Sequence, residues 1–211
     1  MRALYVTHPQ VVIDPAVPTP RWGLSPEGLA RAQAFASRGV VPEGAMIFSS
    51  TENKALDLAG AIAAAIGGPV VAEEAMGEND RSSTGFLTPG LFEATADRFF
   101  AEPQHSIEGW ETAGDAQARI VAAVRRALES VPANRPAVFC GHGAVGTLLK
   151  CHLAGRPIAR REDQSRHGHR GGGNCFVFDL AAGELGCEWT AMEDFAPGWF
   201  AAPVANTHDM V

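Results

Sequence analysis

The sequence has few of the features that indicate a metal centre, a disulfide framework or a membrane protein. Its four cysteines are scattered and show no metal-like pairing, so we expect reduced thiols in a cytoplasmic protein. No apolar run approaches the roughly 20 residues that a membrane-spanning helix needs. The first residues, MRALYV, are too short and too strand-like for a signal peptide. We therefore expect no association with a membrane.

Positive charge is also scarce. The chain has 17 Lys and Arg residues against 24 Asp and Glu, a net charge of -7. Non-specific nucleic-acid binding depends on a basic surface, so we expect no nucleic-acid partner. An anionic small molecule is not excluded, because a local pocket can be positive on an acidic protein. With 211 residues, 46% of them hydrophobic, the chain is predicted to form a single domain over residues 1–211 with a packed core.

Short apolar runs alternate with helical patterns, which is typical of an α/β protein. Strands are predicted at 3–6, 45–48 and 69–72, with helices between them at 25–38 and 51–65. This order implies right-handed crossovers and a mostly parallel sheet, giving a three-layer α/β/α sandwich. The further expected elements are helices at 91–100, 112–130 and 144–153, a strand at 137–140, a hairpin of 175–180 with 185–190, polar loops at 73–89 and 156–173, and a C-terminal tail.

Two of the predicted strands are each followed by a histidine. His8 comes after the first strand, and His142 follows the strand that ends at Cys140. Ligands of open α/β sheets bind in the crevice at the carboxyl ends of the strands. We therefore expect the two histidines to meet at one edge of the sheet, although they are far apart in the sequence.

The order of the polar motifs resembles that of the histidine phosphatase superfamily, also called the phosphoglycerate mutase-like fold. The motifs that carry the resemblance over about residues 1–180 are THP at 7–9, WGLSPEG at 22–28, SSTENKA at 49–55, GENDR at 77–81 and GHG at 141–143. Members of the family begin with a strand and Arg-His-Gly, and they carry a second His-Gly after a late strand. No single motif is specific, but the ordered set is.

The resemblance implies roles for three residues. His8 would attack the phosphorus and become a phosphohistidine, and His142 would bind the charge of the phosphoryl group when protonated. Glu78 matches the acid that protonates the leaving oxygen, and Asp80 is its alternative. Backbone N–H groups at the helix starts after Ser50 and His142 would add donors for an anion.

The sequence departs from the family pattern where the family binds phosphate with arginine. Thr7 stands in place of the first arginine, Lys54 in place of the second, and Pro9 in place of the glycine. Arginine binds phosphate in a bidentate manner, whereas lysine supplies a point charge and threonine a single hydroxyl. We expect another arginine to compensate, preferably Arg81, with Arg21 as the second choice.

The predicted function is therefore hydrolysis of a small phosphorylated molecule through a phosphohistidine, without metal or organic cofactor. The segment 73–110 is expected to form a small lid. His167 and His169 lack a third ligand in their loop, so they are not read as a metal site. Two alternatives stay open: a catalytically degenerate member that binds a phosphorylated ligand or partner, and a mutase acting on a phosphorylated sugar acid. The sequence names no substrate.

Overall fold

The computed structural model describes residues 1–200, and the predicted tail falls largely on 201–211, outside the described part. Its sheet has seven strands, in the order β3-β2-β4-β1-β5-β6, with β7 paired to β5. The strands are β1 (Ala3–Thr7), β2 (Met46–Ser49), β3 (Val70–Ala72), β4 (Ala137–Gly141), β5 (Asn174–Asp179), β6 (Glu184–Leu185) and β7 (Thr190–Ala191). The pairs among β1 to β4 are parallel, whereas β5 pairs antiparallel with β1, β6 and β7. The sheet is therefore mixed, with a parallel half and an antiparallel half.

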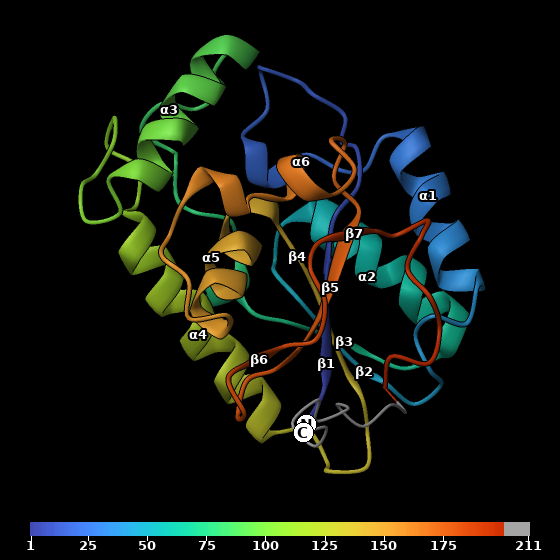
Figure 1. Ribbon diagram of the computed structural model, residues 1–211. Coiled ribbons are helices and arrows are strands. Elements are labelled where there is room, and N and C mark those ends of the chain that lie inside the picture. Colours follow the sequence, from blue (N-terminus) through green and yellow to red (C-terminus); the bar gives the residue numbers. More distant parts are fainter. Residues whose placement is uncertain (201–211) are drawn as a thin grey trace.

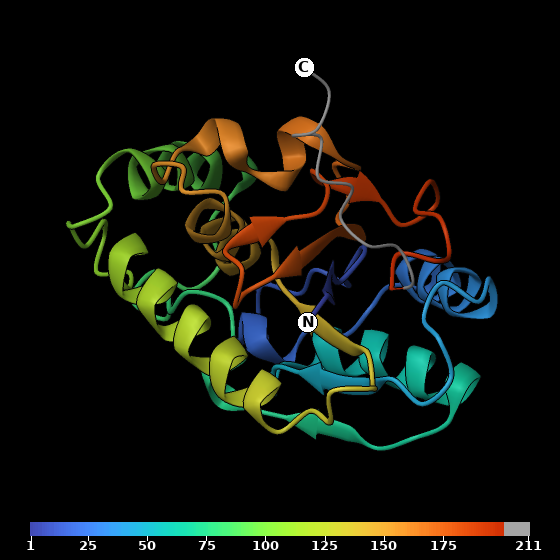
Figure 2. The ribbon, with the colours of Figure 1, turned by 60° about the horizontal axis from the view of Figure 1, so that its bottom comes forward.

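Helices cover both faces of this sheet, as the alternation of elements predicts. They are α1 (Pro26–Ser37), α2 (Asn53–Ile66), α3 (Pro89–Ala101), α4 (Ala113–Glu129), α5 (Gly143–Leu153) and α6 (Gln164–His167), with short 3-10 turns η1 (Thr19–Arg21), η2 (Glu74–Met76) and η3 (Arg160–Glu162). Figure 2 shows α4 and α5 on one side of the strands and α1 and α2 on the other. The predicted three-layer α/β/α fold is confirmed.

Alternate residues of the central strands point into two separate hydrophobic cores. Tyr5 and Phe139 pack with α4 and α5, while Leu4, Val6 and Val138 pack with α1 and α2. Both faces of β1 and β4 are thus buried, which explains why these strands are continuous apolar runs in the sequence. Within residues 1–200, no helix is both long and apolar enough to cross a membrane.

The helix starts follow from local capping. The hydroxyl of Ser25 accepts the N–H of Gly28, and Pro26 occupies the first turn of α1. Thr112 caps α4 in the same way by accepting the N–H of Asp115. These caps agree with the start of each helix predicted from the sequence.

Two local predictions need correction. The predicted strand 185–190 is interrupted between β6 and β7, because Gly186 donates its N–H to the carbonyl of Val177 and the Cys187 thiol accepts the N–H of Val177. The predicted loop 156–173 contains η3 and α6. In this region the fully buried Lys150 of α5 forms ion pairs with Glu162 and Glu188, at 2.9 and 2.6 Å.

The parallel strands end at one edge of the sheet, at the top of Figure 1. The 3-10 turn η1, α3 and α6 lie around this edge in the same view. Segments from the N-terminal loop, the 73–110 region and the 156–173 region therefore gather where β1 and β4 end.

Candidate active site

His8 and His142 lie together at this edge. Thr7 is paired with Gly141 at the ends of β1 and β4, and the backbone N–H of His8 donates to the Gly141 carbonyl at 3.0 Å. A histidine follows each of these strands directly. The two imidazole centroids are 5.3 Å apart, and the ring planes are inclined by 69°. Neighbouring parallel strands of equal register thus bring together two residues that are far apart in the sequence.

The ring of His8 is held in one tautomer. Its Nδ1 lies 2.9 Å from the carbonyl oxygen of Pro9. A carbonyl can only accept, so Nδ1 carries the proton and Nε2 keeps a free lone pair. Burial lowers the pKa of His8 from 6.5 to about 4, and the charges of Lys54 and Arg81 also lower it. The imidazole is therefore neutral at pH 7, the form in which it can act as a nucleophile.

A glycine-rich loop supports His8 from behind. Gly173 donates its N–H to the His8 carbonyl at 3.1 Å. Gly172 has a φ of 74°, and a Cβ at this position would lie 2.3 Å from the same carbonyl oxygen. Only glycine fits this close approach in this backbone conformation. The glycine-rich run at 171–173 thus has a structural role next to the predicted nucleophile.

His142 is the N-cap residue of α5 and is fully buried. Its Nε2 lies 2.7 Å from the Ser50 hydroxyl, and its Nδ1 has no hydrogen-bond partner among residues 1–200. Its backbone N–H donates to the hydroxyl of Tyr5, which in turn donates to the His142 carbonyl. Burial lowers the pKa of His142 well below its ordinary value. His142 thus keeps one buried imidazole nitrogen without a hydrogen-bond partner in the described chain.

Acidification is expected to destabilise the fold between about pH 6.5 and pH 4. In this interval an unfolded histidine binds a proton, whereas His8 with its pKa near 4 stays neutral in the folded chain. The unfolded state then binds more protons, so the free energy of unfolding falls with falling pH, by about 2 kcal/mol at pH 5 for a shift of this size. The lowered pKa of His142 acts in the same direction.

Urea unfolding of the wild type at pH 7.5, 6 and 5 measures this dependence. The variant His142→Asn should flatten the pH profile, while His152→Gln, which replaces an exposed histidine of α5, should leave it unchanged. Equal stability of the wild type at pH 7.5 and pH 5 would contradict the prediction.

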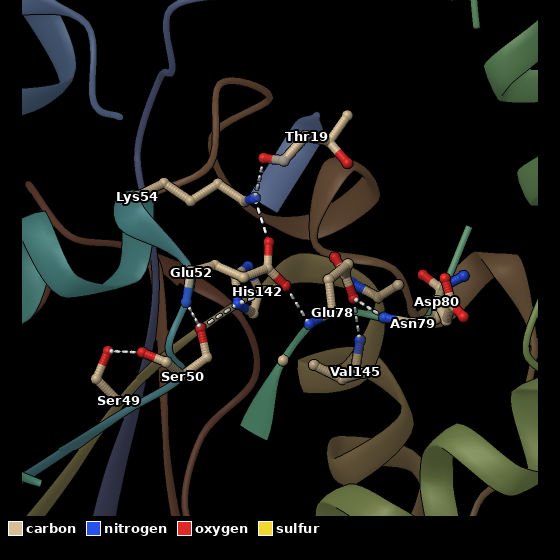
Figure 3. A network of polar contacts seen from close by, with 12 residues as sticks. Thr19, Ser49, Ser50, Glu52, Lys54, Glu78, Asn79, Asp80, His142 and Val145 are labelled. Carbon is tan, nitrogen blue, oxygen red and sulfur yellow. Dashed lines mark hydrogen bonds and ion pairs between the residues drawn. The ribbon is translucent and has the colours of Figure 1, made fainter. Parts of the chain in front are cut away.

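Lys54 is buried and does not stand free in the site. Its ammonium group donates to the carbonyl of Thr19 at 2.9 Å and forms an ion pair with Glu52. Figure 3 shows the Glu52 carboxylate between Lys54 and the backbone nitrogen of Glu78, whose N–H it accepts at 2.8 Å, with His142 alongside. One Glu52 oxygen lies 3.5 Å from His142 Nε2. Glu52 therefore neutralises the cation that replaces the second arginine.

Burial alone would raise the pKa of Glu52, but the charges of His142 and Lys54 and the hydrogen bonds from Lys54 and Glu78 together lower it to about 2. The carboxylate is ionised at neutral pH. Glu52 was not among the site residues predicted from the sequence. The available signal was its place in the SSTENKA motif, two positions before Lys54.

The Glu78 carboxylate lies at the start of α5. It accepts the backbone N–H groups of Ala144 and Val145 at 3.2 and 3.0 Å, and that of Asn79 at 3.2 Å. The helix start that was predicted to bind an anion therefore binds this carboxylate. Arg119 holds the same loop by donating to the carbonyls of Ala75, Gly77 and Glu78. Glu78 and His142 thus belong to one hydrogen-bonded unit around the first turn of α5.

The two arginines that were predicted to bind phosphate, Arg81 and Arg21, differ in their surroundings. The Arg81 guanidinium lies over the rings of Phe92 and Trp110, at 5.1 and 5.9 Å from their centroids, and forms no ion pair within the described chain. Its charge contributes, after burial, to lowering the pKa values of both site histidines. Arg21 is exposed, and its backbone carbonyl accepts from the side-chain amide of Asn53. Arg81 therefore has a free charge near the histidines.

The hydroxyl of Thr7 is fully engaged within the protein. It donates to Gln164 at 2.7 Å and accepts the backbone N–H of Asn174 at 2.9 Å. Thr7 is completely buried. An arginine at this position would have to displace both contacts. The residues around position 7 therefore fit a threonine and not the arginine of the family pattern.

A cavity of about 1080 Å³ opens beside Glu52 and Glu78. Its walls are formed by residues 15–20, 51–52 and parts of 73–86, together with Glu111 and Arg119. Glu52, Glu78 and Arg81 line the cavity, and Glu52 also reaches His142. The wall of the cavity is therefore in contact with the histidine pair through Glu52.

Comparison with known families identifies the chain. The model of the histidine phosphatase superfamily (branch 1) matches residues 18–175. The chain belongs to the histidine phosphatase superfamily. The family resemblance read from the ordered motifs is thereby confirmed. A comparison with curated proteins finds no match.

Solved structures share the fold of this histidine phosphatase superfamily member. The phosphate complex of a mycobacterial glucosyl-3-phosphoglycerate phosphatase is 21% identical, with a TM-score of 0.72, covering 91% of this chain and 98% of that chain. YhfR of Bacillus stearothermophilus is 17% identical, with a TM-score of 0.68 and coverages of 87% and 93%. TTHB049 of Thermus thermophilus is 19% identical, with a TM-score of 0.61 and coverages of 90% and 99%.

Proposed function

We propose that the protein is a phosphatase that hydrolyses a small phosphomonoester through a phosphohistidine at His8. The observation that carries the proposal is the pair of imidazoles 5.3 Å apart, with His8 Nδ1 held by the Pro9 carbonyl and Nε2 left free. Membership of the histidine phosphatase superfamily and the fold shared with a phosphatase that binds inorganic phosphate support it.

In the first step, Nε2 of His8 attacks the phosphorus, the N–P bond forms, and the P–O bond to the leaving alcohol breaks. A carboxyl group gives its proton to the leaving oxygen. In the second step, water attacks the phosphorus, its proton returns to that carboxylate, and the N–P bond breaks to release inorganic phosphate. His142 takes up a proton when the phosphate dianion binds and holds its charge.

Glu78 is the best placed carboxyl group for this proton transfer. Glu52 is held in an ion pair with Lys54, and Asp80 is exposed and accepts the backbone N–H of Ser82. Glu78 lines the cavity in which the leaving group would lie, and its carboxylate is tied to the same helix start as His142. Arg81 supplies positive charge, so the proposed steps require no metal.

The purified protein is expected to hydrolyse an aryl phosphate such as p-nitrophenyl phosphate in the presence of EDTA at an unchanged rate. Acid quenching destroys phosphohistidine and alkali preserves it, so a ³²P label from substrate should stay on the protein only after an alkaline quench. Activity that disappears with EDTA, or an acid-stable label, would contradict the mechanism.

A second candidate is a family member that binds a phosphorylated ligand without turnover. The pairing of Lys54 with Glu52 favours it, because this cation is not free for a phosphoryl group. Calorimetry with inorganic phosphate distinguishes the two functions: binding without any hydrolysis of the aryl phosphate would establish the second candidate.

A further inference from the structure

The carboxylate of Glu52 lies among groups of the kind that bind anions. Its Oε2 forms an ion pair with the ammonium group of Lys54. Its Oε1 accepts the backbone N–H of Glu78 at 2.8 Å and lies 3.5 Å from His142 Nε2. Lysine ammonium groups, imidazoles and backbone N–H groups are also the groups with which proteins bind phosphate. In this protein all three surround a carboxylate of the same chain (Figure 3).

Two of these groups belong to the expected position of the phosphoryl group. His142 holds its charge in the proposed function, and Lys54 stands in place of the second arginine of the family pattern. Besides burial, which has the largest effect, the charge of Lys54 lowers the pKa of His8 and that of Glu52 raises it, so both charges lie near the nucleophile. The Glu52 carboxylate therefore occupies a place where a phosphoryl group would make its contacts.

The side chain of Glu52 has no part in starting α2. Glu52 is the N-cap residue of this helix, but its side chain makes no capping hydrogen bond. Instead the carboxylate reaches the backbone of residues 77–78, where a Cβ added to Gly77 would lie 3.4 Å from Oε1. Glu52 also lines the cavity, and its side chain is 12% exposed. The carboxylate can therefore turn into the cavity without the loss of a helix cap.

We propose that Glu52 is an internal competitor of phosphate: its carboxylate occupies the anion site beside His142 in the free protein and is displaced when a phosphoryl group binds. The proposal rests on the proposed function, in so far as the histidine pair binds a phosphoryl group. On binding, the carboxylate gives up Lys54 to the phosphoryl oxygens and turns into the cavity. After hydrolysis it returns to Lys54, and inorganic phosphate leaves. Glu52 thus weakens the binding of the product and limits product inhibition.

The variant Glu52→Gln tests this competition. Glutamine has nearly the same shape and can accept the N–H of Glu78 through its amide oxygen, but it carries no charge and leaves the ammonium group of Lys54 without an ion-pair partner. We expect calorimetry at pH 7.5 to show inorganic phosphate binding at least about 10-fold more tightly than to the wild type, because a carboxylate opposes the binding of an anion beside it by Coulomb repulsion. The inhibition constant of phosphate against p-nitrophenyl phosphate should fall by the same factor.

The expected result is a gain of affinity, which a purely structural role of Glu52 would not produce, because a damaged site binds phosphate more weakly. The control is Asp179→Asn, which also removes a carboxylate from an ion pair, here with the N-terminal ammonium group at 2.6 Å. Asp179 lies at the end of β5 that is next to the start of β1, whereas His8 follows the end of β1. This variant should bind phosphate with the affinity of the wild type.

The double variant Glu52→Gln/Lys54→Gln separates a freed cation from a general change of charge, because its net charge equals that of the wild type. It should lose most of the gain in phosphate affinity, since the gain depends on the ammonium group that Glu52 releases. A double variant that keeps most of the gain would show that Glu52 and phosphate do not compete for Lys54, and it would overturn the proposal.

Unchanged or weaker phosphate binding in Glu52→Gln would overturn the inference, and weaker binding would show that the carboxylate instead supports a positive charge on His142. Calorimetry does not depend on turnover, so its result is separate from that of the phosphatase assay. Tighter binding to Glu52→Gln without any hydrolysis of p-nitrophenyl phosphate would uphold the competition and overturn the phosphatase function. Hydrolysis by the wild type, together with an unchanged phosphate affinity in Glu52→Gln, would overturn the inference alone.

Discussion

Replacement of His8 by alanine is expected to lower the turnover of p-nitrophenyl phosphate by about 10⁴-fold or more, the range seen when a nucleophile is removed. The Nδ1 of His8 is held by the Pro9 carbonyl, which leaves Nε2 free, and a second imidazole lies at a centroid distance of 5.3 Å. We do not expect His142 to substitute for it, because His142 is fully buried and its Nε2 lies 2.7 Å from the Ser50 hydroxyl. Initial rates and the alkali-stable ³²P label measured on the same preparations test this expectation.

The control for this experiment is His152→Gln, which replaces an exposed histidine of α5 far from the strand ends. It should retain full turnover. Near-native unfolding midpoints for His8→Ala show that the loss is chemical rather than structural. If His8→Ala keeps more than about a tenth of the wild-type rate, another nucleophile carries the reaction.

The second large effect is expected for Arg81→Gln, which should lower kcat by roughly 30- to 1,000-fold. A transferring phosphoryl group spreads its charge over its equatorial oxygens and is stabilised mainly by electrostatics. Loss of one donor aimed at such oxygens corresponds to about 2–4 kcal/mol. Lys54 is neutralised by Glu52 and Thr7 is bound to Gln164, so Arg81 is the remaining free cation of the proposed site within residues 1–200.

Steady-state kinetics of Arg81→Gln and Arg125→Gln test this role. Arg125 is exposed on α4 and outside the cavity, so its replacement changes the net charge equally but should leave kcat unchanged. Arg160 is a poorer control, because it forms ion pairs with Glu93 and Asp97. Arg81→Lys should retain part of the rate, because lysine keeps the positive charge but lacks the planar guanidinium that binds phosphate in a bidentate manner. If Arg81→Gln and Arg125→Gln both change kcat by the same small amount, Arg81 does not compensate for the arginines that the family pattern has at positions 7 and 54.

Much of the fold could be predicted because its signals are local. The strands ending at Thr7 and Gly141 are apolar runs buried on both faces, and Ser25 and Thr112 are side-chain caps within three residues of their partners. The broken strand between β6 and β7 was missed, because the interruption depends on contacts with Val177 across the hairpin. The short η3 and α6 carry too few residues to show a periodic pattern.

The candidate site could be predicted only as far as strand topology determines it. His8 and His142 each follow an apolar strand directly, and parallel pairing of these strands is enough to bring the rings together. The pairing of Glu52 with Lys54 was missed, because residues two positions apart do not face each other within a helix, and the contact forms only because Glu52 precedes α2 in extended backbone.

The sequence by itself determined the family, the order of the elements and the residues that follow the strand ends, because these depend on motifs and on neighbours within a few positions. Only the tertiary structure decided which charges remain free. Thr7 is bound by Gln164 and Asn174, Glu78 by the first turn of α5, and Arg81 by no carboxylate within residues 1–200. Such pairings join loops that are distant in the chain, and only packing on the sheet sets their distances.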